Sequence, residues 1–161
     1  MLFRSSVILL VLVTFIPTLK ATGISTLEGF TKKPKSLVGQ ELLLQHFPGG
    51  QSQPTQILVS KDKSDAVIAA IKLIDGVSSI TPEIQDPANP TIKEVNGKIV
   101  LDATLKVPAD SSAARELIPE IRKAAKSVDD QALVGGISAT FHDVDVASRH
   151  DRNLIIPRSE E

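Results

Sequence analysis

Apolar residues follow three different patterns along the chain, and each pattern predicts a different kind of element. The first 19 residues carry one charged side chain, Arg4, and residues 7–16 are almost entirely aliphatic. Residues 37–47 and 64–75 place apolar side chains at helical spacing, whereas residues 98–107 alternate apolar and polar ones. We therefore expect an apolar leading segment followed by a body that contains both helices and strands.

The body predicts the order strand, helix, strand, strand, helix, strand between Gln56 and Ala139. Its most specific local signal is Asn96-Gly97, a pair that tolerates positive φ and predicts a hairpin. Right-handed connections place both helices on the same face of a four-stranded sheet and leave the other face open to another domain. The predicted fold class is α+β, a ferredoxin-like βαββαβ arrangement with an N-terminal membrane helix.

The second half of the body contains one long amphipathic helix. Asp110 or Ser111 is expected to cap it, and Pro119 should either kink this helix or mark its start. Its charged side chains are expected to be solvated: Arg115, Glu116, Arg122, Lys123 and Lys126. Residues 133–137 then predict a last strand, and residues 140–156 a helix that ends before the proline that follows.

The leading segment is either a membrane helix or a signal peptide. Crossing a bilayer takes about 20 apolar residues, which the segment reaches only if it is counted from Met1 to about Leu19. The small residues Ala21 and Gly23 occupy the two positions that a signal peptidase reads, so a cleaved signal peptide fits the segment as well as a membrane helix does. Residues 23–36, rich in Gly, Ser, Thr and Lys, predict an extended linker at the membrane surface.

The composition excludes several classes of function. A formal net charge of −1 and a pI near 6.3 give no electrostatic footprint for a polyanion, so no nucleic-acid partner is expected. The absence of cysteine excludes disulfides, thiol nucleophiles and zinc sites built on sulfur. With 3% aromatic residues, recognition would depend on shape and aliphatic contact.

No catalytic, cofactor-binding or metal-binding residues are assigned. Five potential metal ligands lie within ten residues of one another: His142, Asp143, Asp145, His150 and Asp151. The two histidines would stand more than two turns apart on a helix, so they form no compact pair of ligands. The glycine pairs do not continue into a phosphate-binding motif, and no G-x-S-x-G motif is present. We expect the chain not to be an enzyme and to need no cofactor.

Several stretches resemble a family of membrane transporters. They are "GISTLEGFTKKPKS", "VGQELLLQHFPGG" and "ALVGGISATFHDVDVASRHDRNLIIP", and the likeness extends over nearly the whole chain. They are similar to the MMPL branch of the resistance-nodulation-division (RND) superfamily as found in actinobacteria. Such transporters have two similar halves, each with a membrane helix, an external porter domain and five more helices.

The resemblance implies a division of the chain into four parts. Residues 1–22 would be the truncated end of a membrane helix, 23–36 a linker, 37–142 a porter-type α+β domain, and 143–161 a helix leading toward a missing membrane segment. The family continues there with a long apolar run, whereas this sequence ends on Arg158-Ser159-Glu160-Glu161. The chain is therefore expected to be a fragment that opens the second half of a transporter.

The resemblance also implies a function, namely proton-driven export of lipids or other hydrophobic compounds. The expected partners are the first porter domain, the remaining membrane helices, the lipid bilayer and a hydrophobic substrate. The domain would lie outside the cytoplasmic membrane, although the lysines after the apolar segment would alone favour the opposite orientation. With no Tyr and no carboxylate in its apolar segment, the chain should not transport alone. The alternative is a secreted or membrane-anchored binding module without enzymatic activity.

Overall fold

The computed structural model describes residues 2–15, 32, 34–84 and 90–158. In this part of the chain the helices are α1 (Leu2–Val13), α2 (Lys35–His46), α3 (Ser64–Lys72), α4 (Ser112–Val128) and α5 (Ile137–Arg158). The strands are β1 (Thr55–Ser60), β2 (Val77–Pro82), β3 (Glu94–Val95), β4 (Lys98–Leu105) and β5 (Leu133–Gly135). A short 3₁₀ turn, Lys61–Lys63, leads from β1 into α3. The predicted α+β class is confirmed.

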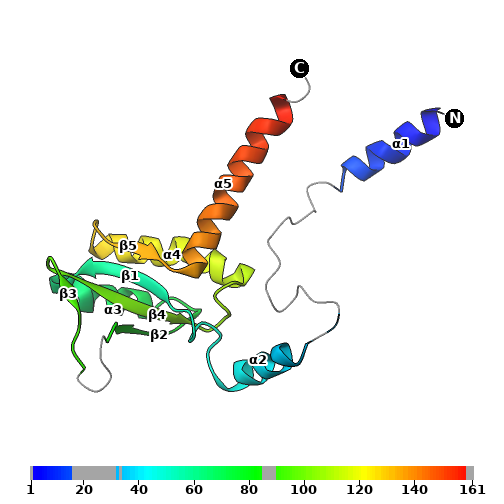
Figure 1. Cartoon of the computed structure of the whole chain (residues 1–161). Helices are drawn as coiled ribbons and strands as arrows, with labels where there is room; N and C mark the ends of the chain where they lie inside the picture. The colour runs from blue at the N-terminus through cyan, green and yellow to red at the C-terminus, as the bar shows by residue number, and fades with distance from the viewer. Residues whose placement is uncertain (1, 16–31, 33, 85–89, 159–161) are drawn as a thin grey trace.

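The strands form one antiparallel sheet in the order β2-β4-β1-β5, and β3 pairs with β4 through the hairpin turn. In β4, the longest strand, Leu101 pairs with Ile57 of β1 and Asp102 pairs with Thr81 of β2. The hairpin predicted at Asn96-Gly97 is confirmed, with φ of 52° and 75° at these two residues. The first strand of the body, β1, pairs with the last strand, β5, so the two lie side by side in Figure 1.

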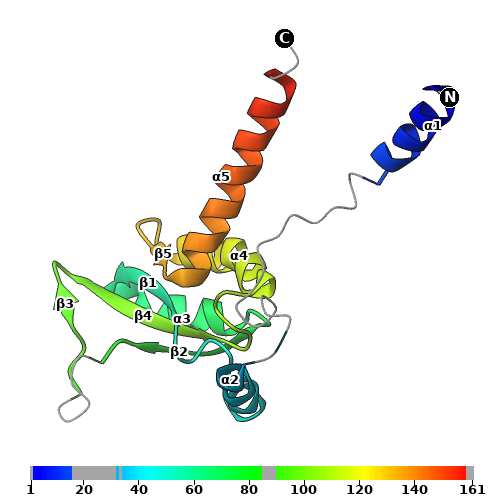
Figure 2. The same cartoon turned by 45° about the vertical axis from the view of Figure 1, so that its right-hand side comes forward.

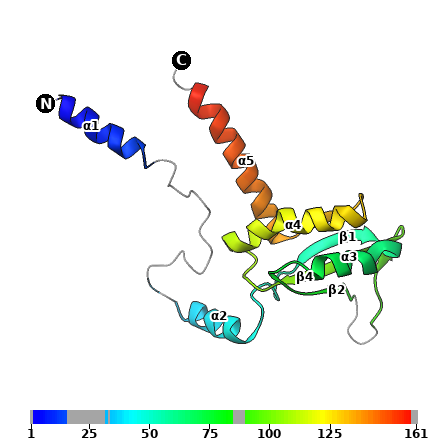
Figure 3. The same ribbon diagram turned by 180° about the vertical axis from the view of Figure 1, so that it is seen from behind.

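The core lies between one face of this sheet and the two helices α3 and α4 (Figures 1 and 3). In β4 the buried and half-buried positions alternate strictly, so its apolar face meets the helices and its polar face is left open. The largest side chains that are fully buried there are Ile57, Ile71, Leu101, Leu105, Ile118 and Ile121. This is the helix stripe and strand face that the spacing of apolar residues predicts.

In strand β2 buried and exposed residues do not alternate regularly. Val77 and Ile80 are both buried, although they are three residues apart, because the pairing with β4 shifts between Val77 and Ser79. Such an irregularity inserts one residue into the strand and returns the next apolar side chain to the same face. The strand thus keeps its contact with the core.

Three predicted boundaries also need correction. The predicted last strand ends at Gly135 rather than at residue 137. Helix α5 begins at Ile137 rather than at residue 140, and it continues through Pro157 to Arg158 rather than ending before the proline. Helix α4 begins at Ser112, so the predicted cap at Asp110 or Ser111 is confirmed and Pro119 does not mark the start of the helix. Its cap is Ser111, whose hydroxyl oxygen accepts a hydrogen bond from the Ala114 amide at 3.1 Å.

The apolar leading segment begins with α1, which ends at Val13 and is followed by a turn at Thr14 and Phe15. The Thr14 hydroxyl donates a hydrogen bond to the carbonyl of Val11 at 2.6 Å. None of the helices in the described ranges has both the length and the apolar content needed to span a bilayer. Most of the predicted linker, residues 23–36, lies outside the described residues.

Candidate functional site

An apolar groove lies between α2, the turn that follows it and the base of α5. It consists of two adjoining hollows of about 290 and 270 Å³, which share Gln40, Gly49 and Ser52 as lining residues. The first hollow is also lined by Leu43, Leu44, Phe47, Pro48 and Gln51, and the second by Gln53, Pro108, Ala109, Asp110, Ile137 and Phe141. We call these two hollows together the α2 groove.

Close backbone packing after α2 shapes this groove. The amides of Gly49 and Gly50 donate hydrogen bonds to the carbonyls of Lys106 and Leu105 at 3.1 and 3.0 Å, which fixes the turn to the end of β4. A Cβ atom at Gly50 would lie 2.7 Å from the Leu105 nitrogen, so a larger residue cannot take this place without moving the backbone. The Pro48-Gly49-Gly50 sequence that ends α2 therefore also holds α2 over the groove.

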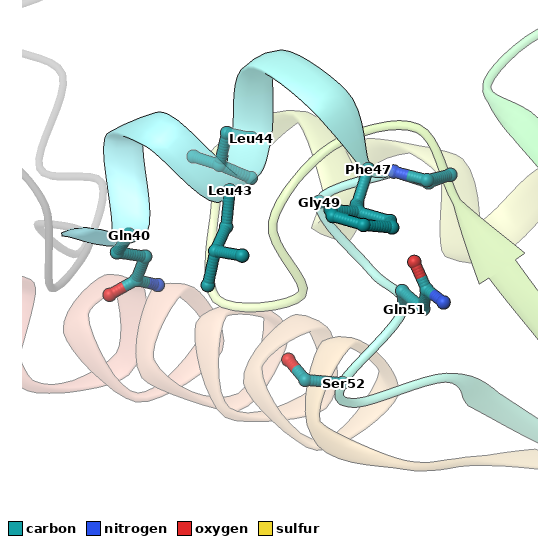
Figure 4. Close-up of a pocket in the computed structure, with 8 residues that line it drawn as sticks. Gln40, Leu43, Leu44, Phe47, Gly49, Gln51 and Ser52 are labelled. Carbon is teal, nitrogen blue, oxygen red and sulfur yellow. The ribbon is translucent and has the colours of Figure 1, made fainter.

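The first hollow presents mainly apolar side chains to solvent, whereas the second has a more polar lining that includes Gln53 and Asp110. Leu43 and Phe47 are 58% and 53% exposed, and Phe141 on the opposite wall is 41% exposed. Figure 4 shows Gln40 and Leu43 reaching down from α2, with Ser52 below them and its hydroxyl directed up toward their side of the hollow. Neighbouring exposed apolar side chains in a concave site are typical of a binding surface for an apolar ligand or partner.

A second, charged hollow of about 240 Å³ lies between α4 and α5. Its lining residues are Ser112, Arg115, Glu116, Pro119, His142, Asp145 and Arg149. The Arg115 side chain is only 8% exposed, and its Nε lies 3.3 Å from Oδ2 of Asp145. Arg115 was predicted to be solvated; this is wrong because the base of α5 packs over it.

A further ion pair joins the same two helices. Arg122 donates from Nη1 and Nη2 to the two carboxylate oxygens of Asp143, at 2.6 and 2.8 Å. These hydrogen bonds lower the pKa of Asp143 below its usual value and raise the pKa of Arg122. Two of the five potential metal ligands, Asp143 and Asp145, are thus paired with arginines. Among the described residues no three His, Cys, Asp or Glu side chains gather closely enough to hold a metal ion.

Asp129 holds the C-terminal end of α4 to the end of β1. Its carboxylate is buried and accepts hydrogen bonds from the Ser60 amide at 2.8 Å, the Gln131 amide at 3.2 Å and the Lys63 ammonium at 3.4 Å. These contacts lower the pKa of Asp129 to about 2, and the hydrogen bond from the Ser60 amide has the largest effect. The residue has a structural role, because its contacts join two elements of the fold.

The open face of the sheet carries a second unusual carboxylate, Asp102 in the middle of β4. Burial, and to a smaller extent the neighbouring Glu83, raise the pKa of this carboxyl. Its Oδ1 is buried and has no hydrogen-bond partner within the described part of the chain. The sequence showed only that Asp102 would lie on the polar face of the strand, so this environment was not predicted.

Two proteins of Streptomyces coelicolor that are named as membrane proteins are similar to almost the whole chain. ActII-3 is 38% identical over 95% of the chain and SCO0839 is 37% identical over 92% of it. The apo-petrobactin exporter of Bacillus anthracis is 24% identical over 91% of the chain. No protein-family model matches the sequence. The chain spans about a fifth of the length of these relatives, between 20% and 22%.

These similarities support association with a membrane and a relation to transport. All three alignments include the α2 groove and the α4–α5 contact, because each covers more than nine-tenths of the chain. The region of this chain that carries the groove and the two ion pairs is therefore aligned with part of a much longer polypeptide in each relative.

Proposed function

We propose that the chain is an external porter-type domain of an RND/MMPL exporter, with a ferredoxin-like fold, and that the α2 groove forms part of one wall of the substrate path. The groove is the observation that carries this proposal, because it gathers exposed apolar side chains, among them Leu43 and Phe47, in one concave site. The similarity to an exporter and to two named membrane proteins supports the same assignment.

Lipids or other hydrophobic compounds are the substrates that suit this groove. Its walls offer leucine and phenylalanine side chains, while the polar groups of Gln40 and Ser52 stand at the junction of the two hollows. An apolar chain lying there would be held by burial of apolar area, and the amide and hydroxyl groups would accept or donate one or two hydrogen bonds. No acid–base chemistry is needed for such a role, which agrees with the proposal that the chain is not an enzyme.

The partners in this proposal are the other porter domain, the membrane helices of the transporter and the lipid bilayer. Proton coupling requires ionisable groups within the membrane, and the apolar segment of this chain holds no carboxylate and no tyrosine. Energy for transport would therefore come from the rest of the transporter, and this domain would respond to it outside the cytoplasmic membrane.

Binding of a fluorescent apolar probe tests the groove. We expect N-phenyl-1-naphthylamine to bind the full chain and to gain fluorescence, and Leu43→Asp to weaken this binding at least tenfold, or about 1.4 kcal/mol. The matched control is Leu133→Asp on β5, where the leucine is equally exposed at 60% but lies outside the groove. Equal probe affinity for the parent chain and the Leu43→Asp variant would contradict the proposal.

A further inference from the structure

The base of α5 is packed against the domain. Ser138 and Ala139 are 1% and 2% exposed, and the Ser138 hydroxyl donates a hydrogen bond to the Ala109 carbonyl at 2.9 Å, in the loop before α4. Val146, two turns further on, is 52% exposed. In Figures 1 and 2 the rest of α5 extends away from the domain as a single straight helix. The angle of this projecting part therefore depends on contacts made at its base.

The two arginine–aspartate pairs described above lie on opposite sides of this base. Arg115 and Arg122 are seven residues apart, about two turns, so they stand on the same side of α4 and roughly 10 Å apart along it. Asp143 and Asp145 are two residues apart, which places their side chains about 200° apart around α5. Helix α5 thus crosses α4 with one ion pair on each flank. We call these four residues the α4–α5 clamp.

The two pairs differ in their surroundings. Arg122–Asp143 has the parallel two-bond geometry that fixes the relative orientation of both side chains, and the two are 32% and 57% exposed. Arg115–Asp145 is largely buried, at 8% and 22% exposed, so separating it would leave the arginine charge in a poorly solvated place. Swinging α5 along α4 in either direction would stretch one of the two pairs.

The base of α5 also forms a wall of the α2 groove, on the same side of the helix as Asp145. Ile137 and Phe141 line the groove, and Asp145 is one turn beyond Phe141 on the same helix. A change in the angle of α5 would therefore move this wall relative to α2. Because α2 is held to β4 through Gly49 and Gly50, it would not follow that movement.

We propose that the α4–α5 clamp fixes the angle of α5 on the domain and thereby sets the width of the α2 groove. The part of the proposal that concerns the groove as a ligand site rests on the proposed function. In an exporter, a force on the far end of α5 would have to overcome the clamp before it could tilt the helix and change the groove. A broken clamp would leave both the angle of α5 and the width of the groove undefined.

Distances between two spin labels test the clamp directly, because the chain has no native cysteine. One label is placed at Leu73→Cys next to α3, where the side chain is 87% exposed, and one at Ser148→Cys on the exposed part of α5. We expect a narrow distance distribution in the labelled parent chain. The Arg122→Asp variant should at least double its width, and the swapped pair Arg122→Asp with Asp143→Arg should restore most of the narrow distribution.

A matched control breaks an ion pair elsewhere. Lys106 and Asp75 lie 2.7 Å apart on the surface, so Lys106→Asp introduces the same change of charge without touching α5, and it should leave the width unchanged. Far-UV circular dichroism of every variant shows that the domain is still folded. An equal width in the parent chain and the Arg122→Asp variant, or a broad distribution in the parent, would overturn the clamp.

Probe binding to the same variants tests the link to the groove. We expect the affinity for N-phenyl-1-naphthylamine to fall at least threefold in Arg122→Asp and to recover in the swapped pair. A doubled width with unchanged affinity would overturn the link while the clamp itself stands. If the parent chain binds no probe, the proposed function fails, and the spin-label distances still decide on the clamp.

Discussion

Single residues show how burial changes the role of a charged side chain in this chain. Asp129 and Asp102 are both aspartates near the sheet, but the first accepts three hydrogen bonds and the second has an oxygen without a partner among the described residues. Their pKa values consequently move in opposite directions, down for Asp129 and up for Asp102. The sequence identifies both as acidic residues and gives no sign of this difference, because Ser60 and Lys63, two of the three donors to Asp129, are distant along the chain.

Asp129 leads to a prediction about acid stability. Its pKa falls from an ordinary 3.8 to about 2 in the folded chain, so its ionised form favours folding. This contribution should be complete above pH 4 and should be lost as the pH falls from about 4 to 2. We expect the Asp129→Asn variant to be less stable than the parent at pH 7, with a difference that shrinks over this range. Urea unfolding at several pH values measures it.

The exposed neighbour Asp130 provides the matched control for this experiment. Asp130→Asn should leave the free energy of unfolding almost unchanged at pH 7. A constant difference between the parent and Asp129→Asn from pH 7 down to pH 2 would show that the hydrogen bonds of the carboxylate do not stabilise the fold.

Among the elements, α2 illustrates how local sequence and long-range packing combine. Its end is predictable from Pro48-Gly49-Gly50, since proline and glycine both disfavour a continuing helix. The contact of Gly50 with the backbone of Leu105 is not predictable, because it joins residues 55 positions apart in the chain. The same is true of α5, whose helical pattern is visible in the sequence but whose packing over Arg115 is not.

Substitution of Gly50 tests the placement of α2. A side chain at this position would meet the Leu105 backbone at 2.7 Å, so we expect Gly50→Val to destabilise the chain by about 1–3 kcal/mol and to weaken probe binding. The matched control is Gly39→Ala within α2, where the added Cβ has no neighbour within 4 Å. That change should stabilise the helix by about 0.5–1 kcal/mol. Thermal unfolding of both variants measures the two effects, and an unaltered melting temperature in Gly50→Val would argue against the close contact.

For the whole molecule, the sequence predicts the fold class and the order of elements better than the site. The alternation in residues 98–107, the Asn96-Gly97 turn and the helical stripe that includes Ile118 and Ile121 together define the two-layer arrangement. The α2 groove and the α4–α5 clamp could not be predicted in this way, because each forms where segments far apart in sequence meet. The resemblance to RND transporters supplied the functional expectation, and the similarity to longer membrane proteins supports its coarser part, association with a membrane.

The proposed function requires the domain to lie outside the cytoplasmic membrane. A single cysteine at Leu133, an exposed residue of the folded domain, can be labelled in intact cells that express the full chain, because the sequence has no other cysteine. We predict that a membrane-impermeant maleimide labels Leu133→Cys in intact cells as completely as in lysed cells, and that the labelled chain sediments with the membranes. Labelling only after lysis would show that the domain lies on the cytoplasmic side and would contradict the proposed function.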